Sequence, residues 1–130
     1  MQKIDVRATF AEGLIRHAGK LTQNEFFHSR SKNIDEKPIG FFDKTDIAVE
    51  KLIRSALLEK FPDDSFYGKE TGGTGDENYW VVDPIDGTAN FTRQIPHYCI
   101  TIAFVSNNKI ELGLIFNPPF GELYVLRKGA

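Results

Sequence analysis

The segment that decides the fold of this chain is Tyr79-Trp80-Val81-Val82-Asp83-Pro84-Ile85-Asp86-Gly87-Thr88-Ala89-Asn90-Phe91. Its first four residues are aromatic or β-branched, which predicts a buried strand that delivers Asp83 at its C-terminal end. Pro84 then stiffens a turn that Gly87 opens, so the carboxylates of Asp83 and Asp86 can point at one place. Hard oxygen ligands of this kind suit Mg²⁺. An isolated pair with this spacing is also typical of a capped turn, because Asp is a favoured turn residue.

Residues on either side of this pair extend the predicted site. Glu70 follows an earlier predicted strand and can supply a third carboxylate. Residues 86–91 predict a short helix, whose first backbone N–H groups, at Gly87 and Thr88, would point towards a phosphate. One loop would then hold a metal ion and an anion together.

A family resemblance supports this interpretation. Gly68-x-Glu70, residues 80–91, Ile95-Pro96-His97 and Arg127-Lys128-Gly129-Ala130 together resemble the pattern of the inositol monophosphatase family of Mg²⁺-dependent, lithium-sensitive phosphatases. The resemblance runs from about residue 22 to the last residue. It implies the N-terminal half of a layered α-β-α-β-α fold, and it implies a homodimer.

The resemblance also implies a set of metal ligands. Glu70, Asp83 and the backbone carbonyl of Ile85 would bind a first Mg²⁺, and Asp83 and Asp86 would be shared with a second. Two or three ions are expected in all. Lys69 departs from the family, which usually has an acid at this position, and a weaker affinity for metal would follow.

Catalytic and phosphate-binding roles follow from the same resemblance. Thr88 and Glu70 would orient the attacking water, and Asp46, at the start of a predicted helix, would accept a hydrogen bond from Thr88. A carboxylate in a first helical turn is also favoured by the helix dipole alone. Gly87, Thr88 and Asp86 would bind the substrate phosphate.

The implied reaction is Mg²⁺-dependent hydrolysis of a phosphate monoester, most simply inositol-1-phosphate, by direct attack of activated water. Histidinol-phosphate phosphatase, 3′(2′),5′-bisphosphate nucleotidase and fructose-1,6-bisphosphatase are the alternative enzymes. A non-catalytic regulatory partner of the transcription machinery is the alternative of another class. A further metal-binding Asp of the family would lie beyond Ala130, so we expect residues 1–130 to form one domain, the N-terminal metal-binding half of a longer phosphatase.

Composition points to a cytoplasmic protein, and the family resemblance implies that its partner is a small phosphate ester. The net charge is −2 with acids and bases interspersed, which argues against direct nucleic-acid binding. Cys99 is the sole cysteine, which excludes an internal disulfide, and its apolar surroundings predict a buried core residue. The longest apolar run, residues 98–105, is far shorter than the roughly 20 residues that span a bilayer, so no membrane role is expected.

Periodicity predicts an α+β chain. A first helix over residues 5–27 carries an apolar stripe at Val6, Phe10, Leu14, Ala18 and Leu21. A second helix begins at Asp43 or Thr45 and stops at Phe61-Pro62. Strands follow at residues 65–67, 79–82, 98–105, 110–116 and 122–126, and residues 71–76 are too rich in glycine for regular structure. Alternation places Ile110, Leu112, Leu114 and Phe116 on one buried face of a mainly antiparallel sheet, covered by the helices.

Several polar residues remain ambiguous. Residues 28–41 are either a lid beside the metal site, with Lys37 near it, or a solvated connector. His97 is either a structural residue, which we favour, or a metal ligand or general acid. His17 and His28 are expected at the surface.

Overall fold

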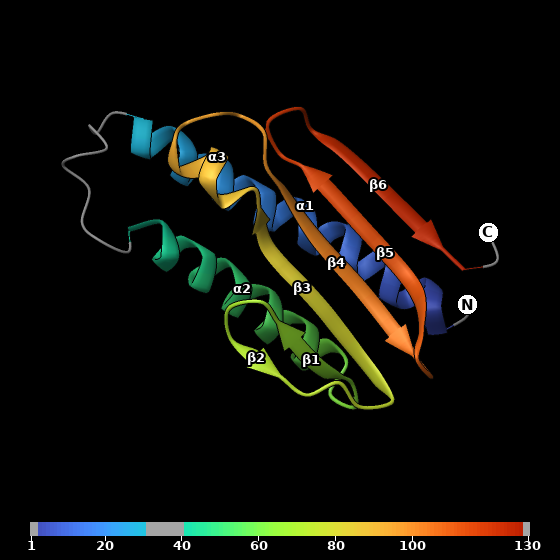
Figure 1. The fold of residues 1–130 in the computed structure, drawn as a ribbon. Coiled ribbons are helices and arrows are strands. Elements are labelled where there is room, and N and C mark those ends of the chain that lie inside the picture. The colour runs from blue at the N-terminus through green and yellow to red at the C-terminus, as the bar shows by residue number, and fades with distance from the viewer. Residues whose placement is uncertain (1–2, 31–40, 129–130) are drawn as a thin grey trace.

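A computed structural model describes residues 3–30 and 41–128 and confirms the α+β class (Figure 1). The helices are α1 (Lys3–Arg30), α2 (Phe41–Lys60) and α3 (Thr88–Thr92). The strands are β1 (Ser65–Gly68), β2 (Gly72–Gly73), β3 (Asn78–Asp86), β4 (Cys99–Ser106), β5 (Lys109–Asn117) and β6 (Glu122–Arg127). Among residues 3–30 and 41–128, none of the helices could span a lipid bilayer.

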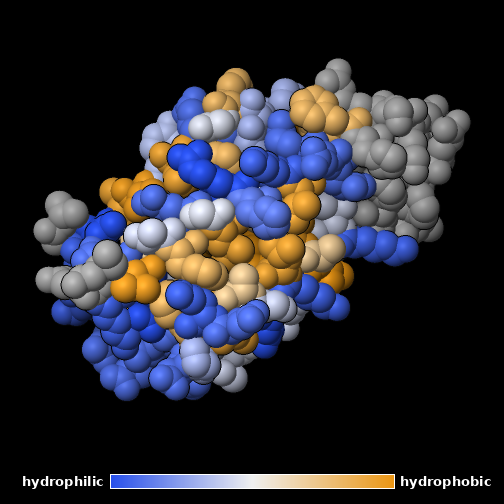
Figure 2. All heavy atoms as spheres, turned by 180° about the vertical axis from the view of Figure 1, so that it is seen from behind, coloured by the Kyte–Doolittle hydropathy of each residue, from blue (hydrophilic) through white to orange (hydrophobic). Residues whose placement is uncertain are grey.

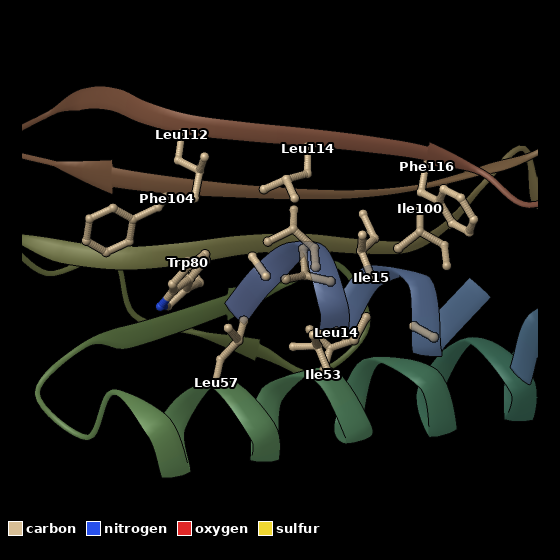
Figure 3. Close-up of a cluster of buried hydrophobic side chains, with 14 of the residues drawn as sticks. Leu14, Ile15, Ile53, Leu57, Trp80, Ile100, Phe104, Leu112, Leu114 and Phe116 are labelled. Carbon is tan, nitrogen blue, oxygen red and sulfur yellow. The ribbon is translucent and has the colours of Figure 1, made fainter. Parts of the chain in front are cut away.

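The strands form one mixed, mostly antiparallel sheet in the order β2-β1-β3-β4-β5-β6. β1 and β3 run parallel, with Phe66 opposite Trp80, and the other neighbouring pairs are antiparallel. α1 packs on β4 and β5, and α2 packs on β1 and β3, so both helices cover the same face. Figure 3 shows the core between these two layers. Its largest buried members include Ile15, Ile53, Leu57, Trp80, Ile100, Leu112 and Leu114.

The two long helices follow the predicted pattern with two differences. α1 continues to Arg30, so residues 28–30 are helical rather than part of a loop. Residues 31–40, with Lys37, lie outside the described residues, as does the side chain of His28, whereas His17 is exposed as expected. α2 begins at Phe41, before either predicted cap, and ends at Lys60, where Phe61-Pro62 was expected to stop it.

Leu21 was wrongly placed in the packing stripe of α1. It is 37% exposed and lines a groove of about 490 Å³ between α1 and α2 with Ala48, Val49 and Leu52. Figure 2 shows the molecule from behind, with apolar side chains gathered in the middle of that face. The stripe that faces the sheet is centred instead on Ala8, Ala11, Leu14, Ile15 and Ala18.

Residues 71–76 do contain regular structure, contrary to the prediction. Gly72 and Gly73 form β2, which pairs with Gly68 and Tyr67 of β1. Gly73 adopts a positive φ of 136°, and a Cβ there would overlap the Phe66 carbonyl. Glycine therefore permits this strand, because no other residue tolerates so close an approach of two backbones.

The predicted alternation along β5 holds for Leu112, Leu114 and Phe116, which are buried. Ile110 is 68% exposed, so its placement in the core was wrong. The register shifts between β4 and β5 at this point, since Phe104 pairs with Leu112 but Val105 pairs with Ile110. The irregularity turns Ile110 off the core face.

A buried ion pair joins the start of α1 to the turn after α2. Arg7 donates through Nε and Nη2 to the two Asp64 carboxyl oxygens, at 2.9 and 2.7 Å. Trp80 Nε1 donates to Asp64 Oδ2 at 2.9 Å. The Arg7 guanidinium also lies 4.6 Å from the Phe61 ring centre and 4.7 Å from that of Phe104. The apolar core therefore encloses a pair whose hydrogen-bonding groups face one another.

Candidate metal and phosphate site

The two central aspartates lie near the end of β3. The strand was predicted to end at Asp83, but it runs to Asp86. Asp83 pairs with Thr101 of β4, and Asp86 pairs with Cys99. An irregularity in the pairing separates these two positions, where Pro84 interrupts the strand. The Ile85 amide donates to Asp83 Oδ1 at 3.2 Å, which restrains that carboxylate. Pairing with β4 therefore holds the segment that the sequence predicted as a turn.

A small second core anchors this end of the sheet. Ile85 of β3 is buried with Phe26 of α1, Phe91 of α3 and Tyr98. The ring centres of Phe26 and Phe91 are 5.6 Å apart, and those of Phe91 and Tyr98 are 5.1 Å apart. Burial of Ile85 fixes the backbone between Asp83 and Asp86, so these two polar side chains project from a rigid base.

The carboxylate of Asp83 lies near a second negative charge and one positive charge. Burial raises the pKa of Asp83, and the nearby negative charge of Asp86 raises it further. The Lys69 ammonium opposes this shift, since its Nζ lies 3.7 Å from Asp83 Oδ2. Carboxylate oxygens are the donors that a hard divalent cation prefers, and such a cation would relieve the repulsion between Asp83 and Asp86. In this structure the Lys69 ammonium supplies part of that compensating charge.

Glu70 lies in the turn after β1, beside β3, because the Lys69 amide donates to the Val82 carbonyl at 3.2 Å. Its side chain is exposed. Within residues 3–30 and 41–128, no three His, Cys, Asp or Glu side chains lie close enough together to hold a metal ion. The ligand set of Glu70, Asp83, Ile85 and Asp86 therefore stays a prediction, with its members at one end of the sheet.

Thr88 and Asp46 do meet. Asp46 is 3% exposed in the first turns of α2, and its Oδ2 lies 3.4 Å from Thr88 Oγ1. Thr88 Oγ1 also lies 3.0 Å from the Ile85 carbonyl oxygen. A hydroxyl group has one hydrogen, so Thr88 donates to one of these acceptors at a time. The shorter distance favours the Ile85 carbonyl in this structure.

Sequence reasoning missed Glu50. It is fully buried on α2, and its carboxyl oxygens accept hydrogen bonds from the backbone amides of Glu70 and Thr71. The available signal was its position, since Glu50 lies among the buried residues Asp46, Val49, Ile53 and Leu57 on the inner face of α2. An acid on the inner face of a helix needs hydrogen-bond partners from elsewhere in the fold.

The predicted phosphate-binding helix is short. α3 spans five residues, and Gly87 caps it with φ 93°. A single turn has little macrodipole, so any phosphate contact here would depend on individual amides at Gly87 and Thr88.

Beside α3 lies a cavity of about 320 Å³ whose lining includes Asp86, Gly87, Asn90, His97 and Cys99. His97 is exposed, and its carbonyl accepts from Asn90 Nδ2 at 2.9 Å. Cys99 is half-buried, so its assignment to the core was wrong: its position on β4 faces Asp86, with Sγ 3.8 Å from Oδ2. Burial and the charge of Asp86 raise the pKa of Cys99 to about 11.

Comparisons with known proteins agree with this fold. Human inositol monophosphatase 1 is 33% identical over 126 residues, which cover 92% of this chain and 46% of that protein. The Nus factor SuhB of Xylella fastidiosa is 36% identical over 130 residues, which cover 98% of this chain and 45% of SuhB. The solved structure of Thermotoga maritima IMPase matches with a TM-score of 0.82 and 30% identity, over 95% of this chain and 49% of that one.

This chain spans about half the length of these relatives. The sequence profile of the inositol monophosphatase family matches residues 3–130, which is nearly the whole chain. The helices packed on a mostly antiparallel sheet, the aspartates of β3 and the Thr88–Asp46 contact accompany that match. The chain therefore belongs to the inositol monophosphatase family.

Proposed function

We propose that this chain is the N-terminal, metal-binding half of an enzyme that hydrolyses phosphate monoesters with Mg²⁺, and that inositol-1-phosphate is the substrate. The observation that carries the proposal is the repulsive pair Asp83 and Asp86 at the end of β3, next to the hydroxyl of Thr88. Family membership supports a phosphatase. The lone cysteine and mixed surface charge support a cytoplasmic location.

The residues that would hold the ions are Asp83, Asp86, Glu70 and the carbonyl of Ile85. They offer carboxylate and carbonyl oxygens, the donors that Mg²⁺ takes in proteins. When bound, two or three Mg²⁺ would supply the positive charge that activates a water molecule and stabilises the leaving oxygen. Asp86 and the amides of Gly87 and Thr88 would hold the substrate phosphate.

The remaining groups position the reacting water. A Thr88 hydroxyl that donates to Asp46 instead of Ile85 keeps its oxygen lone pairs to accept a hydrogen bond from water. That change also leaves the Ile85 carbonyl available as a ligand. The Glu70 carboxylate would accept a hydrogen bond from the second hydrogen of the water. Asp46 is then a positioning residue, because it acts through Thr88.

The half-length match supports a role for further residues in the complete enzyme. We propose that a C-terminal half completes the metal site and reads the alcohol part of the substrate, and that the whole enzyme is a homodimer. Because this half alone has an incomplete ligand set, we expect it to bind metal weakly.

The test pairs the intact mass of the purified protein with phosphate release from inositol-1-phosphate, with Mg²⁺ and then with added Li⁺. A mass near twice 14.7 kDa and lithium-inhibited release would support the proposal. Asp83→Asn should abolish release, while Asp76→Asn, at an exposed loop position, should not. The enzyme assignment would be refuted if the protein released phosphate from none of four esters: inositol-1-phosphate, histidinol phosphate, a 3′(2′),5′-bisphosphate nucleotide and fructose-1,6-bisphosphate.

The similarity to SuhB, named a Nus factor, supports a second candidate function as a regulatory partner of the transcription machinery. A net charge of −2 favours binding to protein over direct binding to RNA. If this function exists, a column that carries immobilised RNA polymerase and its Nus factors should retain the Asp83→Asn protein, which lacks the proposed metal ligand. Absence of retention for both the wild type and the variant would exclude it.

A further inference from the structure

Glu50 is a buried acid with a specific set of partners. Its side chain lies on the inner face of α2 and is 0% exposed. The Glu70 amide lies 3.0 Å from Oε1 and 3.2 Å from Oε2, and the Thr71 amide donates to Oε2. One side chain of the helix therefore holds two consecutive amides of the turn that follows β1, 20 residues further along the chain.

The fold makes room for this contact at Gly68. A Cβ at that position would overlap the Glu50 carboxyl group, so only glycine lets the carboxylate pass under the end of β1. Gly68 also pairs with Val82 of β3, which fixes it relative to Asp83. The carboxylate of Glu50 thus links α2 to the end of the sheet where Asp83 lies.

We propose that Glu50 is a positioning residue that fixes the backbone of Glu70 so that the Glu70 carboxylate can join Asp83 and Asp86 around a divalent cation. This inference rests on the proposed function. The side chain of Glu70 is exposed, so its reach depends on where its backbone is held. Groups that orient a metal ligand typically change metal affinity about 10–100-fold when they are removed.

The chemistry explains why a glutamate is needed. Both amides are donors, and both oxygens of a carboxylate accept. Glutamine keeps the size but replaces one acceptor by an NH₂ group, which would face a backbone N–H. Glu50→Gln therefore breaks the contact without opening a cavity.

The experiment records ¹H–¹⁵N NMR spectra of this chain during titration with Mn²⁺. This ion is a paramagnetic substitute for Mg²⁺ and broadens nearby amide signals even when it binds weakly. In the wild type, Mn²⁺ should broaden the amides of Asp83, Ile85 and Asp86. Glu50→Gln should weaken that Mn²⁺ binding at least about tenfold. The same change should speed hydrogen exchange at the amides of Glu70 and Thr71.

Glu59→Gln is the matched control, because Glu59 is exposed on the same helix, and it should change neither measurement. If Glu50→Gln does not fold, Gly68→Ala replaces it, since the added methyl group displaces the Glu50 carboxylate and leaves its charge in place. The expected losses are the same.

The outcomes separate the two claims. A wild type with no Mn²⁺ effect at Asp83 to Asp86 overturns the metal site, and with it this inference. A wild type that binds Mn²⁺ while Glu50→Gln binds it equally well overturns the inference alone, even if the variant melts at a lower temperature. Unchanged exchange at Glu70 and Thr71 in the variant overturns it too.

Discussion

Removing the charge of Asp64 should destabilise the protein severely. In the Asp64→Asn variant the amide group keeps the shape of the side chain, but the guanidinium of Arg7, which is 5% exposed, loses its opposite charge. The new NH₂ group must also face either Arg7 or Trp80 Nε1, and both are donors. Breaking a buried ion pair in this way costs about 3–5 kcal/mol of the free energy of unfolding.

The shift in melting temperature follows from the size of the chain. An unfolding entropy of about 2.1 cal/mol/K per residue over 130 residues converts that cost into a decrease of roughly 10–20 °C. Far-UV circular dichroism during heating and urea titration gives both quantities. The neighbouring exposed residue offers a matched control, Asp63→Asn, which should leave the melting temperature within about 2 °C of the wild type.

A double variant tests the cause. Replacing both partners, as in Arg7→Met with Asp64→Leu, leaves Trp80 Nε1 without its acceptor but leaves no buried charge, and should cost less than Asp64→Asn alone. A loss below about 1 kcal/mol for Asp64→Asn would refute the reasoning, because the carboxylate would then have no buried charge to balance.

The remaining predictions concern packing, thiol reactivity and metal affinity. Gly19→Ala should destabilise the protein by about 1–3 kcal/mol in urea titrations, because the new Cβ would overlap the Phe116 ring. Gly13→Ala, on the same helix with open space around it, should instead stabilise it by about 0.5–1 kcal/mol, and equal effects would contradict the packing argument. The raised pKa of Cys99, about 11, predicts slow alkylation by iodoacetamide at pH 8 that accelerates up to that pH. Asp86→Asn should accelerate the reaction at pH 8, and an unchanged rate would remove Asp86 as a cause. Lys69→Glu should tighten Mn²⁺ binding several-fold in ¹⁵N titrations, since its ammonium lies 3.7 Å from Asp83 Oδ2, whereas Lys60→Glu, at the far end of α2, should leave the affinity unchanged.

The parts of the fold that the sequence predicts well are set by local periodicity. α1, α2 and the hairpins of β4, β5 and β6 have apolar repeats that indicate their type without knowledge of the partners. The central motif at residues 79–91 identified the family, because so many of its residues are rare in combination.

The differences arise where a distant segment decides the local structure. Pro84 favours a turn, but pairing with β4 continues the strand to Asp86. Ile110 leaves the core because the register between two strands shifts, which alternation within one strand does not reveal. Cys99 sits in an apolar run, yet its position on β4 faces Asp86.

The functional role of Glu50 was missed for the same reason. Its partners lie 20 and 21 residues away along the chain, and a lone glutamate on a helix ordinarily indicates an exposed face. Pattern reasoning indicates which residues are buried, but long-range pairing determines which buried polar groups meet.

The packing of α1 on β5 has a consequence for how the chain folds. The first helix contacts a strand that begins at Lys109, so a large part of its partner surface is synthesised about 80 residues after α1 ends at Arg30. Arg127 of β6 also donates to Asp5 of α1, which joins segments 122 residues apart. Contacts between such distant segments cost much loop entropy before they gain any stability, which slows folding. During synthesis, the apolar faces of α1 and α2 therefore stay uncovered until the antiparallel hairpins emerge, and this exposed surface is prone to aggregation.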